Sequence, residues 1–167
     1  MQQILPKSQG ENVVKTPKQQ ILEFFQPLQL EVKFQDVAEG FFAEVESMAY
    51  PLQGSNAGEF NFETVSIYYG GEQGDYRFAI SIILNKVTDA SEVLRYSNDY
   101  NCKTYGWKAE LDREEMIDPF FSFDYEFEFV QPDRIGDIMA SAFDELCTMA
   151  NSEYFYPLMR LQRKKQN

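Results

Sequence analysis

The chain of 167 residues contains no histidine. Histidine is the commonest general base near neutral pH and the commonest metal ligand, so its absence excludes Ser-His-Asp and Cys-His catalytic arrangements within this chain. The two cysteines, Cys102 and Cys147, are far apart in the sequence and do not make a disulfide framework. No apolar run approaches the length of a membrane-spanning helix, and the first residues lack the pattern of a signal peptide. We therefore expect a reduced, cytoplasmic protein.

Basic residues are few, with 15 Lys and Arg against 27 Asp and Glu, which gives a formal net charge of −12. Binding to nucleic acid requires cations that replace the counterions around phosphates, and an anionic membrane surface repels an acidic chain. We therefore expect neither nucleic acid nor membrane as a partner. A basic peptide or protein suits this charge better, although solubility alone also explains an acidic surface.

Acidic residues occur in patterns that also suggest catalysis or metal binding. Asp124, Glu126 and Glu128 alternate along one expected strand, and paired carboxylates do carry out glycoside hydrolysis. Charged residues are, however, the normal occupants of the solvent face of a strand. The acidic stretch from Glu110 to Asp118 lacks the spacing of a calcium loop. We therefore expect no catalytic residue, no metal site and no cofactor, and predict that the protein is not an enzyme.

Alternation of residue types is clearest between positions 120 and 130. The odd positions are aromatic and the even positions are polar, which is typical of a strand with one buried face. We expect Asp124, Glu126 and Glu128 to face water. The side chains expected in the core are Phe121, Phe123, Tyr125, Phe127 and Phe129.

The other patterns predict further helices and strands in the same domain. Thr16, Pro17 and Gln19 form a capping pattern that starts a helix, and Pro27 ends it near Phe25. Further helices are expected over 89–101 and 131–149, and strands over 30–34, 41–50, 62–69, 76–87, 105–111 and 120–130. Short turns between strands predict an α+β fold, a curved and mainly antiparallel sheet with helices packed on one face. Residues 1–15 are expected to form a flexible arm and 16–167 a single domain.

A short motif links the chain to a known family. The stretch Leu94–Asn101, followed by Lys108–Asp112, resembles the YbjN-like family, which is related in fold to the type III secretion chaperones. Asn98, Tyr100 and Asn101 match the Asn-x-aromatic-Asn ending of the middle helix in that family. The resemblance implies a chaperone-like fold and a small acidic protein, often dimeric, that binds an extended segment of a client without catalysis. Independently of the family, the amides of Asn98 and Asn101 are suited to cap the helix end and hold the hairpin.

These observations predict a non-catalytic module, chaperone-like or regulatory, that binds a partner protein along a sheet edge or an apolar helix groove and could form a homodimer. Packing remains the alternative role for the aromatic contact residues, because aromatic side chains usually serve the core. The alternative function is an immunity-type or antitoxin-like protein whose acidic face blocks a basic partner or mimics nucleic acid. The expected contact residues are Tyr96, Tyr100, Tyr105, Trp107, Asp124, Glu126 and Glu128.

Overall fold

The structure, a computed structural model, describes residues 13–52, 58–73, 75–83, 90–103, 106–112 and 120–150. Within these residues the helices are α1 (Pro17–Phe25), α2 (Ala90–Lys103) and α3 (Ile135–Ala150), with short 3-10 helices at Gln26–Leu28 and Pro132–Arg134. The strands are β1 (Lys33–Val37), β2 (Gly40–Leu52), β3 (Gly58–Glu72), β4 (Asp75–Ile83), β5 (Lys108–Asp112) and β6 (Phe120–Phe127).

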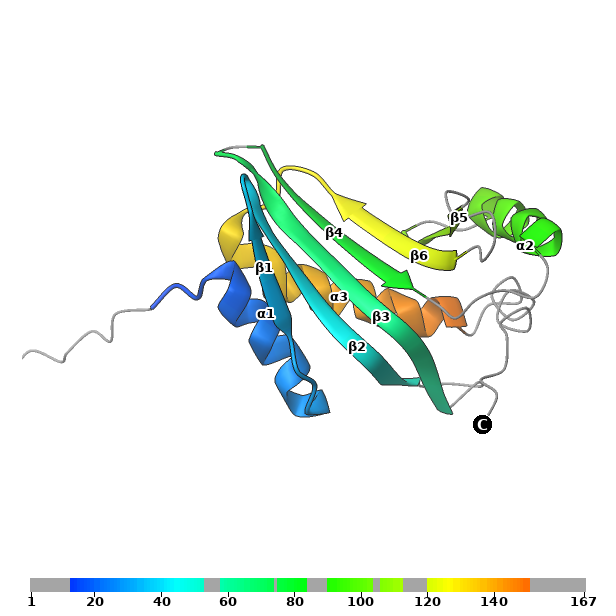
Figure 1. The fold of residues 1–167 in the computed structure, drawn as a ribbon, viewed down its shortest axis with the longest axis horizontal. Helices are drawn as coiled ribbons and strands as arrows, with labels where there is room; N and C mark the ends of the chain where they lie inside the picture. The colour runs from blue at the N-terminus through cyan, green and yellow to red at the C-terminus, as the bar shows by residue number, and fades with distance from the viewer. Residues whose placement is uncertain are drawn as a thin grey trace, which may run out of the picture.

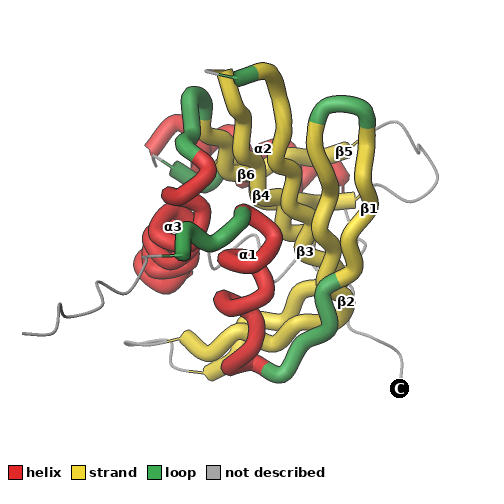
Figure 2. The backbone as a smooth tube through the Cα atoms, turned by 90° about the vertical axis from the view of Figure 1, so that its left-hand side faces the viewer, coloured by secondary structure: helices red, strands yellow, loops and turns green. Residues whose placement is uncertain are grey.

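The strands form one sheet in the order β1-β2-β3-β4-β6-β5, and every neighbouring pair is antiparallel. Helices α1 and α3 lie side by side against one face of this sheet (Figures 1 and 2). The α+β fold predicted from the sequence is therefore confirmed. The sequence patterns did not predict that β6 lies between β4 and β5. After β4 the chain passes through α2 to the edge strand β5, and β6 then fills the place between β5 and β4.

The start of α1 follows the capping pattern in the sequence. The Gln19 backbone N–H donates to Thr16 Oγ1 at 3.2 Å, and the Thr16 backbone N–H donates to Gln19 Oε1 at 2.9 Å. A cap of this kind typically contributes about 1 kcal/mol to helix stability. The helix ends at Phe25, immediately before the 3-10 turn that contains Pro27, so both predicted boundaries are confirmed.

The core lies between the sheet and the two helices α1 and α3. Alternate residues of the central strands are buried, as their period-2 patterns predict, and each such apolar side chain contributes roughly 1.5–3 kcal/mol before entropy is counted. The strands contribute Phe41, Ala43, Val45, Val65, Ile67, Phe78, Ile80, Ile82 and Phe123. The helices contribute Ile21, Phe25, Ile135, Met139, Ala142, Phe143 and Leu146.

Strand β6 differs from its prediction at its C-terminal end. Phe123 is fully buried, and Tyr125 and Phe127 are half-buried against the core. The strand stops at Phe127, and Phe129 has a left-handed backbone with φ of 57° and a side chain that is 67% exposed. The prediction that Phe129 lies in the core is wrong because this single left-handed residue interrupts the alternation. Val130 is buried in its place, and its N–H donates to the Tyr76 carbonyl oxygen at 2.9 Å.

Two other strands are displaced from their predicted positions. The strand expected at 30–34 occurs as β1 over Lys33–Val37, and the strand expected at 105–111 occurs as β5 over Lys108–Asp112. Gly106 precedes β5 with a positive φ of 80°, a conformation that favours glycine and turns the chain into the strand. Residues 1–12 of the predicted arm and the whole region after residue 150 lie outside the described residues.

Candidate functional site

Tyr100 and Trp107, two of the aromatic residues expected to contact a partner, belong to the core. Both side chains are 1% exposed. The Trp107 Nε1–H donates to the Ala142 carbonyl oxygen of α3 at 2.7 Å, and the Tyr100 ring meets Phe123 edge-on with centroids 5.5 Å apart. Their burial leaves them no surface for a partner, so we assign both to packing, which corrects the expected contact set.

Tyr96 lies beside them but is only half-buried. The guanidinium of Arg95 lies over its ring, 4.7 Å from the ring centroid, in the geometry of a cation–π contact. Tyr105 lies outside the described residues. Among the residues that the structure describes, Tyr96 is therefore the one expected aromatic contact residue near α2 that keeps exposed surface.

The two asparagines of the α2 motif have different environments. The Asn101 amide makes two hydrogen bonds to Ala109 of β5, because its Nδ2 donates to the Ala109 carbonyl oxygen and its Oδ1 accepts from the Ala109 N–H, both at 2.8 Å. The side chain thus stands where a further strand would pair, and it satisfies an edge that otherwise invites pairing. Asn98 is exposed on the same helix.

The three acidic residues expected to form a docking face separate into two environments. Asp124 and Glu126 point to the face of the sheet opposite α1 and α3, which we call the open face, whereas Glu128 is exposed beyond the end of β6. Asp124 is half-buried and accepts a hydrogen bond from Ser122 Oγ at 2.8 Å. Glu126 is exposed.

The strand register assembles the rest of the open face in rows across the sheet. Phe42 of β2 is 41% exposed, and its ring centroid lies 5.1 Å from that of the half-buried Tyr68 on β3. One row consists of Gln35, Phe42, Tyr68, Ala79 and Glu126. The next row consists of Lys33, Glu44, Ser66, Ser81, Asp124 and Lys108.

The open face therefore has an aromatic pair and small central side chains, with carboxylates on both sides. Ser66, Ala79 and Ser81 occupy the middle strands, and the carboxylates come from β2 and β6. Lys33 lies on this face as well, where it forms an ion pair with Glu46 at 3.0 Å. Sequence reasoning missed Phe42 and Tyr68 as surface residues. The signal that could have found them was the alternation of β2, which places Phe42 on the same side as its glutamates.

Two tyrosines on the opposite, core-facing side have shifted pKa values. Burial, together with a hydrogen bond to the Glu145 carboxylate and its charge, raises the pKa of Tyr125 to about 12. Burial and the neighbouring Tyr76 raise the pKa of Tyr69 to about 12. Both groups stay neutral near pH 7 and supply no acid–base chemistry there. The hydrogen bond of Tyr125 joins β6 to Glu145 of α3.

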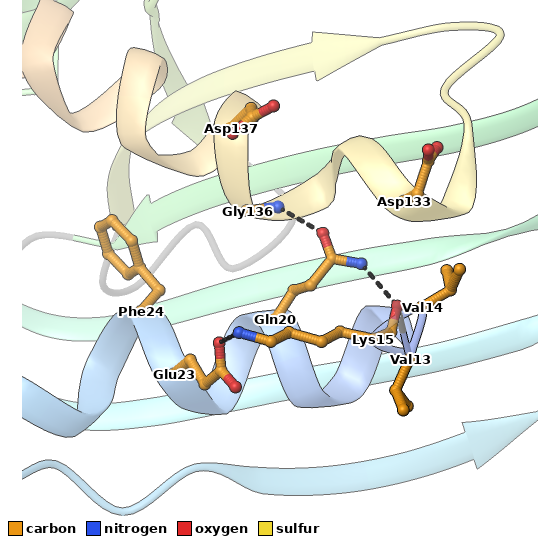
Figure 3. Close-up of a pocket in the computed structure, with 9 residues that line it drawn as sticks. All are labelled: Val13, Val14, Lys15, Gln20, Glu23, Phe24, Asp133, Gly136 and Asp137. Carbon is orange, nitrogen blue, oxygen red and sulfur yellow. Dashed lines mark hydrogen bonds and ion pairs between the residues drawn. The ribbon is translucent and has the colours of Figure 1, made fainter. Parts of the chain in front are cut away.

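A groove between α1 and the start of α3 is the second candidate site (Figure 3). It is open to solvent, has a volume of about 760 Å³, and is lined by Val13, Val14, Lys15, Gln20, Glu23, Phe24, Asp133, Gly136 and Asp137. Its central polar side chain is already occupied. Gln20 Nε2 donates to the carbonyl oxygens of Lys15 at 3.0 Å and Pro132 at 2.8 Å, and Oε1 accepts from the Gly136 N–H at 2.8 Å.

The groove is therefore better explained as a junction between the helices than as a ligand site. Lys15 and Glu23 also neutralise each other across α1, with Nζ and Oε2 at 2.6 Å. No group of three or more potential metal ligands occurs in the part of the chain that the structure describes. Among those same residues, no helix has the length and apolar character that a membrane crossing requires.

Solved structures include chains that are similar to this one. No protein-family model matches the sequence, and no curated protein matches it either. A solved structure of YbjN from E. coli is similar, with a TM-score of 0.40 and 13% sequence identity over 81% of this chain and 89% of that chain. This likeness concerns the fold alone and carries no residue roles to this chain.

Proposed function

We propose that this protein is a non-catalytic binding module that holds a basic, extended segment of a partner protein on the open face of its sheet. The observation that carries the proposal is the exposed Phe42, packed on Tyr68 and flanked by carboxylates from β2 and β6. Helices α1 and α3 cover the opposite face of the sheet (Figure 2).

The chemistry of the open face suits such a segment. Glu44 and Glu126 are exposed, and carboxylates at the border of an interface steer a cationic partner and fix its orientation. Phe42 offers apolar and π surface of the kind that anchors interfaces. Side chains two residues apart in an extended segment point to the same face. A segment in which every second residue is basic and apolar in turn would therefore place basic side chains on the carboxylates and apolar ones on the aromatic pair.

A direct test uses a labelled peptide about 12 residues long, hence able to cross the sheet, in which lysine and leucine take turns at the odd positions and serine occupies the even positions. The same peptide with glutamate in place of lysine serves for comparison. We expect the lysine peptide alone to bind. Replacing both Glu44→Lys and Glu126→Lys should weaken its binding about tenfold or more, because both carboxylates face the bound segment. Fluorescence anisotropy measures the affinities.

The matched control changes the same net charge on the helical side of the protein. Asp133 and Asp144 are both exposed there, and Asp133→Lys with Asp144→Lys should leave binding almost unchanged. An equal loss in both double variants would show that net charge alone attracts the peptide and would reject the open face as the site. A folded basic protein that binds while the extended peptide does not would favour the immunity-type alternative.

A further inference from the structure

The two edges of the sheet are treated differently. At β5, the outward N–H and carbonyl of Ala109 both bind the Asn101 amide. At β1, the hairpin turn fixes which groups point outward. Val37 and Gly40 flank a two-residue turn and form its hydrogen-bonded pair. Hydrogen-bonded and non-hydrogen-bonded pairs alternate along an antiparallel ladder. The backbone of Gln35 is therefore hydrogen-bonded to that of Phe42. The backbone N–H and carbonyl groups of Phe34 and Asp36 consequently point away from β2.

These outward groups of β1 have no hydrogen-bond partner in the part of the chain that the structure describes. Such an edge is a template for another strand. Its side chains also leave room for one, because Lys33, Gln35 and Asp36 are exposed and Val37 is 38% exposed. The edge therefore lacks the closure that Asn101 provides at β5.

We propose that the β1 edge pairs with the β1 edge of a second copy of this chain, in an antiparallel and two-fold symmetric arrangement. The register that uses all the outward groups places Phe34 opposite Asp36 of the second copy, with Gln35 facing its own equivalent on the axis. Four backbone hydrogen bonds form, two at each Phe34–Asp36 pair. A register that places Asp36 opposite its own equivalent would bring like charges together.

Charge complementarity favours a second copy in this register. The Lys18 Nζ lies 2.6 Å from Asp36 Oδ1 and 5.5 Å from the centroid of the Phe34 ring. Asp36 of the second copy arrives opposite that Phe34, so each Lys18 lies between two carboxylates. Each Lys18 thus offsets part of the repulsion between two chains whose net charge is −12.

The pairing joins two six-stranded sheets into one. The open faces of both copies then lie on the same side of the combined sheet, because side chains alternate between faces along β1 in both copies. Gln35 lies on the open face beside Phe42, so the symmetry axis passes through the centre of a surface twice as wide as that of one copy.

Sedimentation velocity of the full chain tests the backbone pairing at protein concentrations from about 5 to about 200 μM. Asp36→Pro removes an outward N–H without removing a bond of the β1–β2 hairpin, and Asp36→Ala removes the same carboxylate but keeps the N–H. We expect the wild type to dimerise, Asp36→Ala to dimerise more weakly, and Asp36→Pro to lose at least about tenfold more affinity than Asp36→Ala. A monomeric wild type, or equal behaviour of the two variants, would overturn the proposal.

A cross-linking experiment tests the register and does not depend on the proline variant folding. With Cys102 and Cys147 replaced by alanine, Gln35→Cys should form a disulfide between copies, since Cα atoms in a non-hydrogen-bonded pair lie about 4.5 Å apart. Lys33→Cys is the matched control, because residue 33 faces residue 37 and two such thiols lie roughly 13 Å apart. Equal cross-linking at both positions, or none at position 35, would reject this register.

Discussion

At the scale of single residues, the Asn101 amide closes one edge of the sheet, because it binds both outward backbone groups of Ala109. The amide of Asn101 was expected to hold the hairpin, but its partner depends on which backbone groups of β5 face outward. That orientation follows from the pairing of β5 with β6, which no local pattern contains. The core roles of Trp107 and Tyr100 were hidden for the same reason, because a burial partner on α3 or β6 lies far away in the sequence.

The two asparagines of α2 form a matched pair for mutation. Asn101→Ala should lower the free energy of unfolding by about 1–3 kcal/mol, because it leaves the N–H and carbonyl of Ala109 without their partners. Asn98→Ala changes an exposed side chain on the same helix and should stay within about 0.5 kcal/mol of the wild type. Urea denaturation measures both, and similar values would show that the Asn101 amide does not stabilise the edge.

Tyr125 predicts how stability falls at alkaline pH. Its pKa is raised to about 12 in the folded protein, against the ordinary value of 10.0. A raised pKa means that the unfolded chain releases the proton first, so the stabilising contribution is complete below pH 10 and is lost as the pH rises from 10 to 12. Tyr125→Phe should therefore have a shallower loss of stability across this window. Urea melts between pH 9 and pH 11 measure the slope, and an unchanged slope would contradict the assignment.

At the scale of elements, periodicity predicted most of the fold because helices and strands with one buried face carry their pattern locally. The capped helix α1, the hairpin strands β3 and β4, and the long helix α3 all occur where they were expected. Strand order was not predictable, because β6 pairs with both β4 and β5 through contacts distant in sequence. The end of β6 was missed because one left-handed residue, Phe129, is invisible to a period-2 pattern.

A pair of phenylalanines in this segment tests the corrected description of β6. Phe123 is fully buried, so Phe123→Ala should cost about 3–5 kcal/mol of unfolding free energy, as truncations of core phenylalanines do. Phe129 is 67% exposed, so Phe129→Ala should cost less than about 1 kcal/mol. Thermal or urea unfolding compares the two variants. A large loss for Phe129→Ala would mean that the original alternation holds and that Phe129 is a core residue.

At the scale of the whole molecule, the charge of −12 acts on the two proposed interactions in opposite directions. Two copies of the chain repel each other over long distances, whereas a basic segment is attracted to the open face.

The candidate site could be predicted only in part from the sequence, because strand register brings its residues together. The alternation of β6 correctly placed Asp124 and Glu126 on the side of the strand away from the core, although Asp124 is half-buried there. Phe42 and Tyr68 join them only through the register of the strands β2, β3, β4 and β6.

Salt should therefore separate self-association from partner binding. Raising the ionic strength from about 0.01 M to about 0.15 M shortens the Debye length from about 30 Å to about 8 Å. Dimerisation through backbone pairing at the β1 edge should strengthen, because the repulsion between two acidic copies is screened. Binding of the lysine–leucine peptide should weaken over the same range, because the attraction is screened as well. Sedimentation and anisotropy on one protein sample measure the two responses. A fall in both affinities would mean that ion pairs between copies, such as Lys18–Asp36, outweigh the net repulsion. The dimer would then be held by charge and not by the backbone pairing that we propose.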